Sequence, residues 1–206
     1  MRSRIGGCAA VRDDALTPEK IPKMRQPTGS AYFMEEHHDA SARHTLAILV
    51  DNEPGVLARV IGLFSGRGYN IDSLTVSEVS HETNLSRITV VTTGPADVID
   101  QIKTQLDRLV PVHSVVDLTL TGRALERELL LVKVRGKGEN RTEALSLADA
   151  FRARVIDATI ESFVFEITGK PDKLDQFIVL MTPLGLVEVS RTGVAAIARG
   201  PEGMDG

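Results

Sequence analysis

The sequence predicts an α+β protein made of two consecutive ferredoxin-like βαββαβ domains after a disordered N-terminal arm. Its 206 residues leave room for one or two domains. The order strand, helix, strand, strand, helix, strand can be read twice along the chain, and the second copy repeats residues of the first. We therefore expect a flexible arm at 1–43, a first domain at 44–122, a second domain at 123–200 and a tail at 201–206.

The arm shows no sustained period of 2 or 3.6 residues and contains Pro18, Pro22 and Pro27. Such a segment buries little apolar surface, so we expect it to be mobile. The chain has no continuous apolar stretch before Asp13 and Asp14, in contrast to a secretory signal. No apolar run reaches the ~18 residues that a membrane-spanning helix needs. We therefore expect a cytoplasmic protein without a membrane partner.

The first domain opens with the apolar, β-branched run 44–50, which predicts a strand. A turn follows, in which Asp51 or Asn52 could cap a helix and Pro54 suits its first turn. The next residues predict an amphipathic helix, because apolar side chains recur at i, i+3, i+4 and i+7. These are Leu57, Val60, Ile61 and Phe64.

Gly66 and Gly68 end this helix. Alternating apolar residues predict strands at 70–79, 87–93 and 110–120. The segment 94–110 predicts the second helix, with an apolar stripe on one side. Its members are Val98, Ile102, Leu106 and Leu109.

The same order of elements returns in the second domain. We expect strands at 127–136, 155–162, 163–169 and 186–197, and helices at 141–153 and 170–185. A shift of 75 residues aligns the middle of the two copies. It pairs Ile88 with Phe163, Val90 with Phe165, Gly94 with Gly169 and Asp97 with Asp172. We interpret the match as a structural repeat, that is, a pair of similar domains.

The sequence contains no recognisable catalytic or metal-binding motif. No histidine has the spacing of a zinc site, and G-x-S-x-G and P-loop motifs are absent. The single cysteine, Cys8, allows neither an internal disulfide nor a thiolate metal cage. We therefore predict no catalytic residues and no metal. The histidines are His37, His38, His44, His81 and His113.

The segment from Asp51 to Leu57 has the composition of a small-ligand site. A helix that begins directly after a strand presents unpaired N–H groups and a partial positive charge, which suit a carboxylate. Gly55 allows close approach, and the amide of Asn52 can both donate and accept hydrogen bonds. Val56, Leu57 and Ile71 could hold a small apolar side chain. From the motif alone, a plain helix cap is the favoured interpretation.

The run NEPGVLARVIGLFSGRGYNIDSLTV within residues 44–76 strongly resembles the ACT domain of the regulatory (small) subunit of acetolactate synthase. The similarity continues through SRITVVTTG, ERELLLVKV, ESFVFEITG and LGLVEVSRTGVAAIARG, so it covers residues 44–200. Only the arm and the last few residues lie outside it.

This resemblance implies a subunit with no catalytic centre of its own. The catalytic subunit it serves carries thiamine diphosphate, Mg²⁺ and FAD and condenses two pyruvates, or pyruvate with 2-oxobutyrate, on the route to valine, leucine and isoleucine. The small subunit raises catalytic activity and confers feedback inhibition by valine or a related amino acid. The resemblance also implies a homodimer of ACT domains. The implied effector site combines Asn52, Gly55 and Val56 of one chain with Asn70 and Ile71 of the other.

Two alternatives come from other functional classes. The βαββαβ order is also that of RNA-recognition modules, but these need aromatic residues on their central strands. The first domain offers none there, the net charge is −4, and only Phe163 and Phe165 lie suitably in the second. We therefore expect no nucleic-acid partner. The other alternative is a stand-alone ACT-type amino-acid sensor that regulates another enzyme or transcription.

Overall fold

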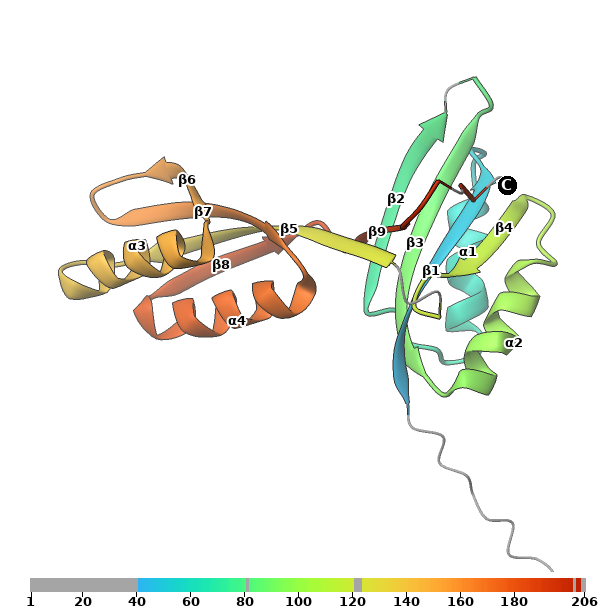
Figure 1. The fold of residues 1–206 in the computed structure, drawn as a ribbon, viewed down its shortest axis with the longest axis horizontal. Coiled ribbons are helices and arrows are strands. Elements are labelled where there is room, and N and C mark those ends of the chain that lie inside the picture. Colours follow the sequence, from blue (N-terminus) through green and yellow to red (C-terminus); the bar gives the residue numbers. More distant parts are fainter. Residues whose placement is uncertain (1–40, 81, 121–123, 202, 205–206) are drawn as a thin grey trace, which may run out of the picture. The chain divides into compact units, whose positions relative to one another are not determined.

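The computed structural model describes residues 41–80, 82–120, 124–201 and 203–204 (Figure 1). The predicted arm therefore lies outside the described residues up to position 40, and so do Cys8, His37, His38 and His81. No helix within the described ranges is long and apolar enough to cross a membrane.

The first half of the described chain is a four-stranded antiparallel sheet with two helices on one face (Figure 1). Its strands lie in the order β2-β3-β1-β4, with β2 and β4 at the edges. This is the predicted ferredoxin-like arrangement. The elements are β1 (Ala42–Asp51), α1 (Val56–Ser65), β2 (Ser73–Ser80), β3 (Leu85–Gly94), α2 (Ala96–Leu106) and β4 (Val112–Asp117).

The second half repeats this topology, with strands in the order β6-β7-β5-β8. The aligned glycines Gly94 and Gly169 both end a strand, and the aligned acids Asp97 and Asp172 both lie in the first turn of the following helix. The structure thus confirms the predicted repeat. The elements are β5 (Ala124–Arg135), α3 (Glu139–Phe151), β6 (Arg154–Ala158), β7 (Ser162–Gly169), α4 (Pro171–Met181), a 3₁₀ turn (Thr182–Leu184) and β8 (Leu186–Arg191).

Each half has its own apolar core between sheet and helices. The first core is aliphatic apart from Phe64, with Leu46, Ile48 and Val90 completely buried. The second is built on phenylalanines, of which Phe165 and Phe177 are completely buried and lie edge to face. Apolar burial of this kind is the main stabilising contribution to both halves.

The predicted strand at 186–197 is two strands in the structure. Gly193 adopts φ +84° between β8 and a further strand, β9 (Ala195–Ala198), and L side chains rarely occupy this region. β9 pairs with the beginning of β5, from Ala124 to Arg127, whereas the rest of β5 pairs with β7 and β8.

β9 also contributes to a third core, on the face of the first sheet opposite its helices. Val194 and Ala196 are buried there against Ala47, Val91 and Leu118. The C-terminal strand therefore packs on the first sheet, which the strand pattern of the sequence did not predict.

Candidate effector-binding site

The loop between β1 and α1 presents an exposed asparagine. The backbone N–H of Asn52 donates to the carbonyl oxygen of Asn84 at 2.7 Å, and the Asn84 amide donates to the carbonyl oxygen of Asn52 at 3.4 Å. Asn84 has φ +52°, a conformation that asparagine tolerates better than most residues. Among the described residues, the Asn52 side chain has no hydrogen-bond partner. Its amide is therefore available to a ligand.

Helix α1 begins without a side-chain cap. Its N-cap residue is Gly55, with φ +88°, and no side chain accepts a hydrogen bond from the first turn. The expectation that Asp51 or Asn52 caps the helix is therefore wrong, because Asp51 ends β1 and accepts a hydrogen bond from His113 instead, with 2.7 Å between its Oδ1 and Nε2. A Cβ built on Gly55 meets no atom within 4 Å, so the space in front of the helix is open.

The first turn of α1 also lacks the acidic residue that the other helices have. Among the α-helices of the described chain, α2, α3 and α4 carry Asp97, Glu139 and Asp172 in their first turns, whereas α1 carries none. Acidic side chains at this position offset the partial positive charge of a helix start. At α1 that charge is left for an external anion, and the first-turn N–H groups of Leu57 and Ala58 have no acceptor within the helix.

Two neighbouring aliphatic residues of the predicted site, Val56 and Leu57, differ in burial from the sequence-based expectation. Val56 is only 3% exposed and packs in the first core, and its N–H donates to the carbonyl oxygen of Glu53. Leu57 is 37% exposed, although the sequence placed it on the buried stripe. The reason is that the helix begins at Val56, so the row that faces the sheet runs through Val56, Val60 and Phe64. The Leu57 side chain is therefore the one open to a ligand.

Asn70 and Ile71 lie in the loop that leads from α1 to β2, and not on a strand as the pattern at 70–79 predicted. Local hydrogen bonds hold the loop: the Asn70 amide donates to Asp72 at 2.6 Å, and the Thr92 hydroxyl donates to the Asn70 carbonyl oxygen at 2.6 Å. Ile71 is half-buried against the first core.

A single chain does not bring the predicted site residues together. Asn52 and Gly55 precede α1, whereas Asn70 and Ile71 follow it, and a helix of 10 residues is about 15 Å long. The two groups therefore lie at opposite ends of α1. A site made of both groups needs two copies of the chain, as the resemblance implies.

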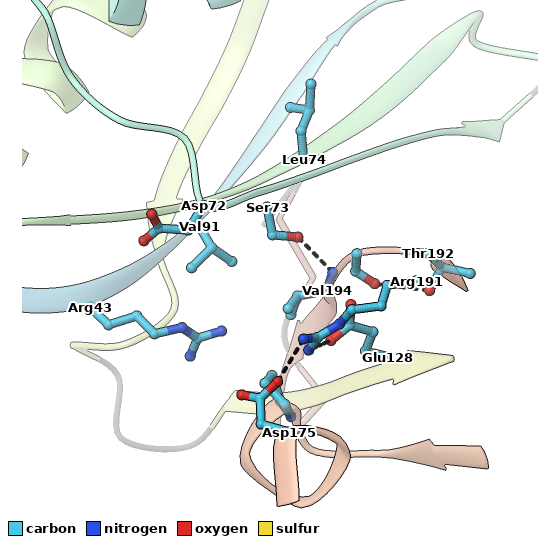
Figure 2. A pocket seen from close by; sticks show the side chains of 12 residues that line it. Arg43, Asp72, Ser73, Leu74, Val91, Glu128, Asp175, Arg191, Thr192 and Val194 are labelled. Carbon is cyan, nitrogen blue, oxygen red and sulfur yellow. Dashed lines mark hydrogen bonds and ion pairs between the residues drawn. The ribbon is translucent and has the colours of Figure 1, made fainter. Parts of the chain in front are cut away.

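The beginning of β2 lines a hollow of about 430 Å³ that sequence reasoning missed (Figure 2). Asp72 and Ser73 lie on one side of it, and Glu128, Asp175 and Arg191 lie on the other. The only sequence signal for it was the number of charged residues in β5 and β8.

Three charged side chains at this hollow form one network. Arg191 donates to both carboxylate oxygens of Glu128, at 2.9 and 2.6 Å, and to Asp175 at 2.6 Å. The hydrogen bonds to Glu128 are the main reason that the pKa of Arg191 is raised above its ordinary value. The Glu128 side chain is only 4% exposed. The network ties β8 to β5 and α4 of the second half.

Neither metal-binding nor RNA-binding geometry appears in the described chain. The described residues contain no group of three or more histidine, cysteine, aspartate or glutamate side chains that could hold a metal ion. Phe163 and Phe165 face the helices and are at most 6% exposed, so they offer no stacking surface for bases. His44 is buried and paired with Asp117, with 2.8 Å between its Nδ1 and Oδ2.

Two family models match the two halves separately. The first, the acetohydroxyacid synthase (AHAS) small subunit-like ACT domain, matches residues 46–114, and the second, the small subunit of acetolactate synthase, matches residues 127–200. The probable acetolactate synthase small subunit of Archaeoglobus fulgidus is 45% identical over 158 residues, which cover 77% of this chain and 98% of the relative. The chain belongs to the acetolactate synthase small-subunit family.

Further relatives agree with this membership. The small subunit of Mycolicibacterium smegmatis is 39% identical over 161 residues, covering 78% of this chain and 94% of that protein. The crystal structure of the acetolactate synthase small subunit from Thermotoga maritima matches with a TM-score of 0.70 and 38% identity, covering 78% of this chain and 99% of that one.

The family membership confirms the resemblance found in the sequence and the two-domain fold. It assigns the chain to the small, regulatory subunits, which have no catalytic centre of their own, and so agrees with the absence of catalytic motifs. It also implies a catalytic large subunit as the partner.

Proposed function

We propose that this chain activates the catalytic subunit of acetolactate synthase in the cytoplasm and makes it sensitive to feedback inhibition by valine or a related branched-chain amino acid. The chain supplies neither acid, base nor nucleophile to the reaction. It shifts the catalytic subunit between states of different activity, and the effector reverses this shift. Thiamine diphosphate, Mg²⁺ and FAD belong to the catalytic partner in this proposal.

The observation that carries the proposal is the start of α1. This helix has an open glycine N-cap, and in contrast to the other α-helices of the described chain it has no acidic residue in its first turn. The carboxylate of a free amino acid supplies the missing negative charge. The Asn52 amide and the exposed Leu57 side chain lie next to this position and suit the rest of an aliphatic amino acid.

The position of β2 supports a site shared by two chains. Among the described strands, β2 pairs only with β3, so it lies at an edge of its sheet, and it carries two exposed valines, Val76 and Val79. If β2 pairs with its copy about a two-fold axis, the strands run antiparallel. The beginning of one β2, which follows Asn70, then lies near the end of the other, which leads to Asn84. Asn52 is hydrogen-bonded to Asn84 and therefore lies near that end of β2. The pairing thus brings Asn70 of one copy toward Asn52 of the other.

Calorimetric titration of the purified chain with valine, leucine and isoleucine tests the effector site. We expect saturable binding of at least one of these amino acids. Each site combines the loop before α1 of one chain with the loop before β2 of the other, so the expected ratio is two ligands per dimer. Light scattering on the same sample tests the pairing, because a monomer has a mass of 22.3 kDa. A monomer that binds none of the three amino acids contradicts the proposed site.

Turnover of the catalytic subunit tests the regulatory role. We expect no acetolactate from the isolated chain, even with thiamine diphosphate, Mg²⁺ and FAD present. Added to the catalytic subunit, the chain should raise turnover, and valine should reverse the increase. Turnover that stays unchanged over a full titration of this chain contradicts activation.

A further inference from the structure

The turn between β8 and β9 lies directly on strand β2 (Figure 2). The backbone N–H of Val194 donates to the hydroxyl of Ser73 at 2.9 Å, and the Val194 side chain is buried against Val91. A Cβ built on Gly193 would come within 2.8 Å of the Thr75 hydroxyl oxygen and 2.9 Å of the Ser73 hydroxyl oxygen. The turn therefore packs on β2 without free space between them. We expect a shift of β2 to displace the turn, and a shift of the turn to displace β2.

Short connections lead from this contact into both halves. On the first side, Ser73 follows Asn70 and Ile71, the predicted effector residues, with only Asp72 between them. On the other side, the turn follows Arg191, which is anchored to Glu128 and Asp175 of the second half. A movement of the loop at Asn70 thus reaches the second half across one backbone-to-hydroxyl hydrogen bond.

The contact leaves polar groups unsatisfied. Among the described residues, the Thr75 hydroxyl and the Arg87 Nε are buried without a hydrogen-bond partner, although Arg87 donates from its Nη2 to the Ala196 carbonyl oxygen at 2.8 Å. Buried polar groups without partners are costly, so this arrangement of the turn on β2 is not fully stabilised.

We propose that the turn at residues 192–194 couples the effector loop at Asn70–Ile71 to the second domain, with Ser73 and Gly193 as positioning residues. This inference rests on the proposed function. In it, an amino acid bound at the loop shifts the beginning of β2, and the turn passes the shift to β8. The second domain thereby transmits the occupancy of the site to the catalytic subunit.

The test compares valine binding with valine inhibition in Ser73→Ala and Gly193→Ala, each reconstituted with the catalytic subunit. Both variants should still bind valine and activate the catalytic subunit. The valine concentration for half-inhibition should rise about tenfold or more, since allosteric coupling typically spans about 5- to 150-fold. Ser77→Ala, at an exposed position farther along the same face of β2, should leave inhibition unchanged. Gly200→Ala is the matched glycine control, because Gly200 has φ +107° but no atom within 4 Å of an added Cβ.

The outcomes separate this proposal from a purely structural role. Unchanged inhibition in both variants overturns the coupling. Loss of valine binding together with inhibition also overturns it, because the turn would then only support the site. If Gly193→Ala does not fold, Ser73→Ala decides, since it removes one hydroxyl and adds no bulk. A wild-type chain that neither binds nor responds to valine, leucine or isoleucine refutes the proposed function itself, before any variant is made.

Discussion

Helices α1 and α3 occupy equivalent places in the two halves but begin differently. Both follow the first strand of a βαββαβ unit, and both have a glycine N-cap with positive φ, at Gly55 and Gly138. The first turn of α3 contains Glu139, and Arg141 lies with its guanidinium 3.9 Å from the centroid of the Phe163 ring. The first turn of α1 contains no acidic residue, whereas the space at the N-cap glycine is open in both helices.

The comparison separates what the shared topology provides from what local residues add. The repeat supplies a sheet, two helices and a glycine turn in both halves. Of these two equivalent helices, only α1 has no acidic side chain at its positive end. A carboxylate ligand is therefore expected at the start of α1 and not at the start of α3. The second half contributes an aromatic core and a charged network instead.

The largest expected effect is on stability, in the second core. Phe165→Ala should lower the free energy of unfolding by about 3–5 kcal/mol, because it leaves a cavity among completely buried rings. Val90→Ala, at the equivalent position of the first half, should cost less, since a smaller side chain is removed. Urea unfolding measures both. Equal costs would show that the two cores do not differ in the way their side chains suggest.

Gly55→Asp should give α1 the internal anion that α3 has. We expect the loss of valine inhibition with activation retained, which removes a coupling of about 1–3 kcal/mol. The backbone at φ +88° is unfavourable for aspartate, so stability should also fall, by about 1–2 kcal/mol. Gly55→Asn is the matched control, with the same backbone cost and no charge. If Gly55→Asn abolishes inhibition as fully as Gly55→Asp does, charge is not the reason.

Arg191→Met should destabilise the second half more than the first. It leaves the buried Glu128 carboxylate without its partner, which should cost about 1–3 kcal/mol. The cost should be lower than for a fully buried pair, because the Arg191 side chain is 34% exposed. Hydrogen exchange is the measurement, with faster exchange expected in β8 and α4. If amide exchange became equally fast in β1 and β3, the two apolar cores would not be independent in stability.

Glu188→Gln should have the smallest effect. The hydrogen bond from Lys133 lowers the pKa of Glu188, so the pair stabilises the fold above the ordinary carboxyl pKa and ceases to do so as the pH falls through the lowered value. Because Glu188 is fully exposed, solvent screens this contribution. We expect no measurable change in melting temperature at pH 7. A clear decrease in melting temperature would mean that the pair of Lys133 and Glu188 is less accessible to solvent than its exposure indicates.

The sequence determined the secondary-structure order, the repeat and the family, because these depend on local signals. Apolar periodicity, strand-ending glycines and a long run such as NEPGVLARVIGLFSGRGYN are read without tertiary contacts. It also placed Gly55 and Asn52 next to a helix start, although only the structure shows that no side chain caps that helix. These signals act over a few residues, so one chain is enough to read them.

Only the tertiary structure decided which side chains remain available and what each strand packs against. Val56 is buried and Leu57 exposed, because the sheet selects one row of α1. Asn70 lies in a loop, and residues 195–198 form a separate strand on the first sheet, since Gly193 redirects the chain at φ +84°. Contacts such as that between Ser73 and Val194 join residues more than a hundred positions apart, and no local pattern encodes them.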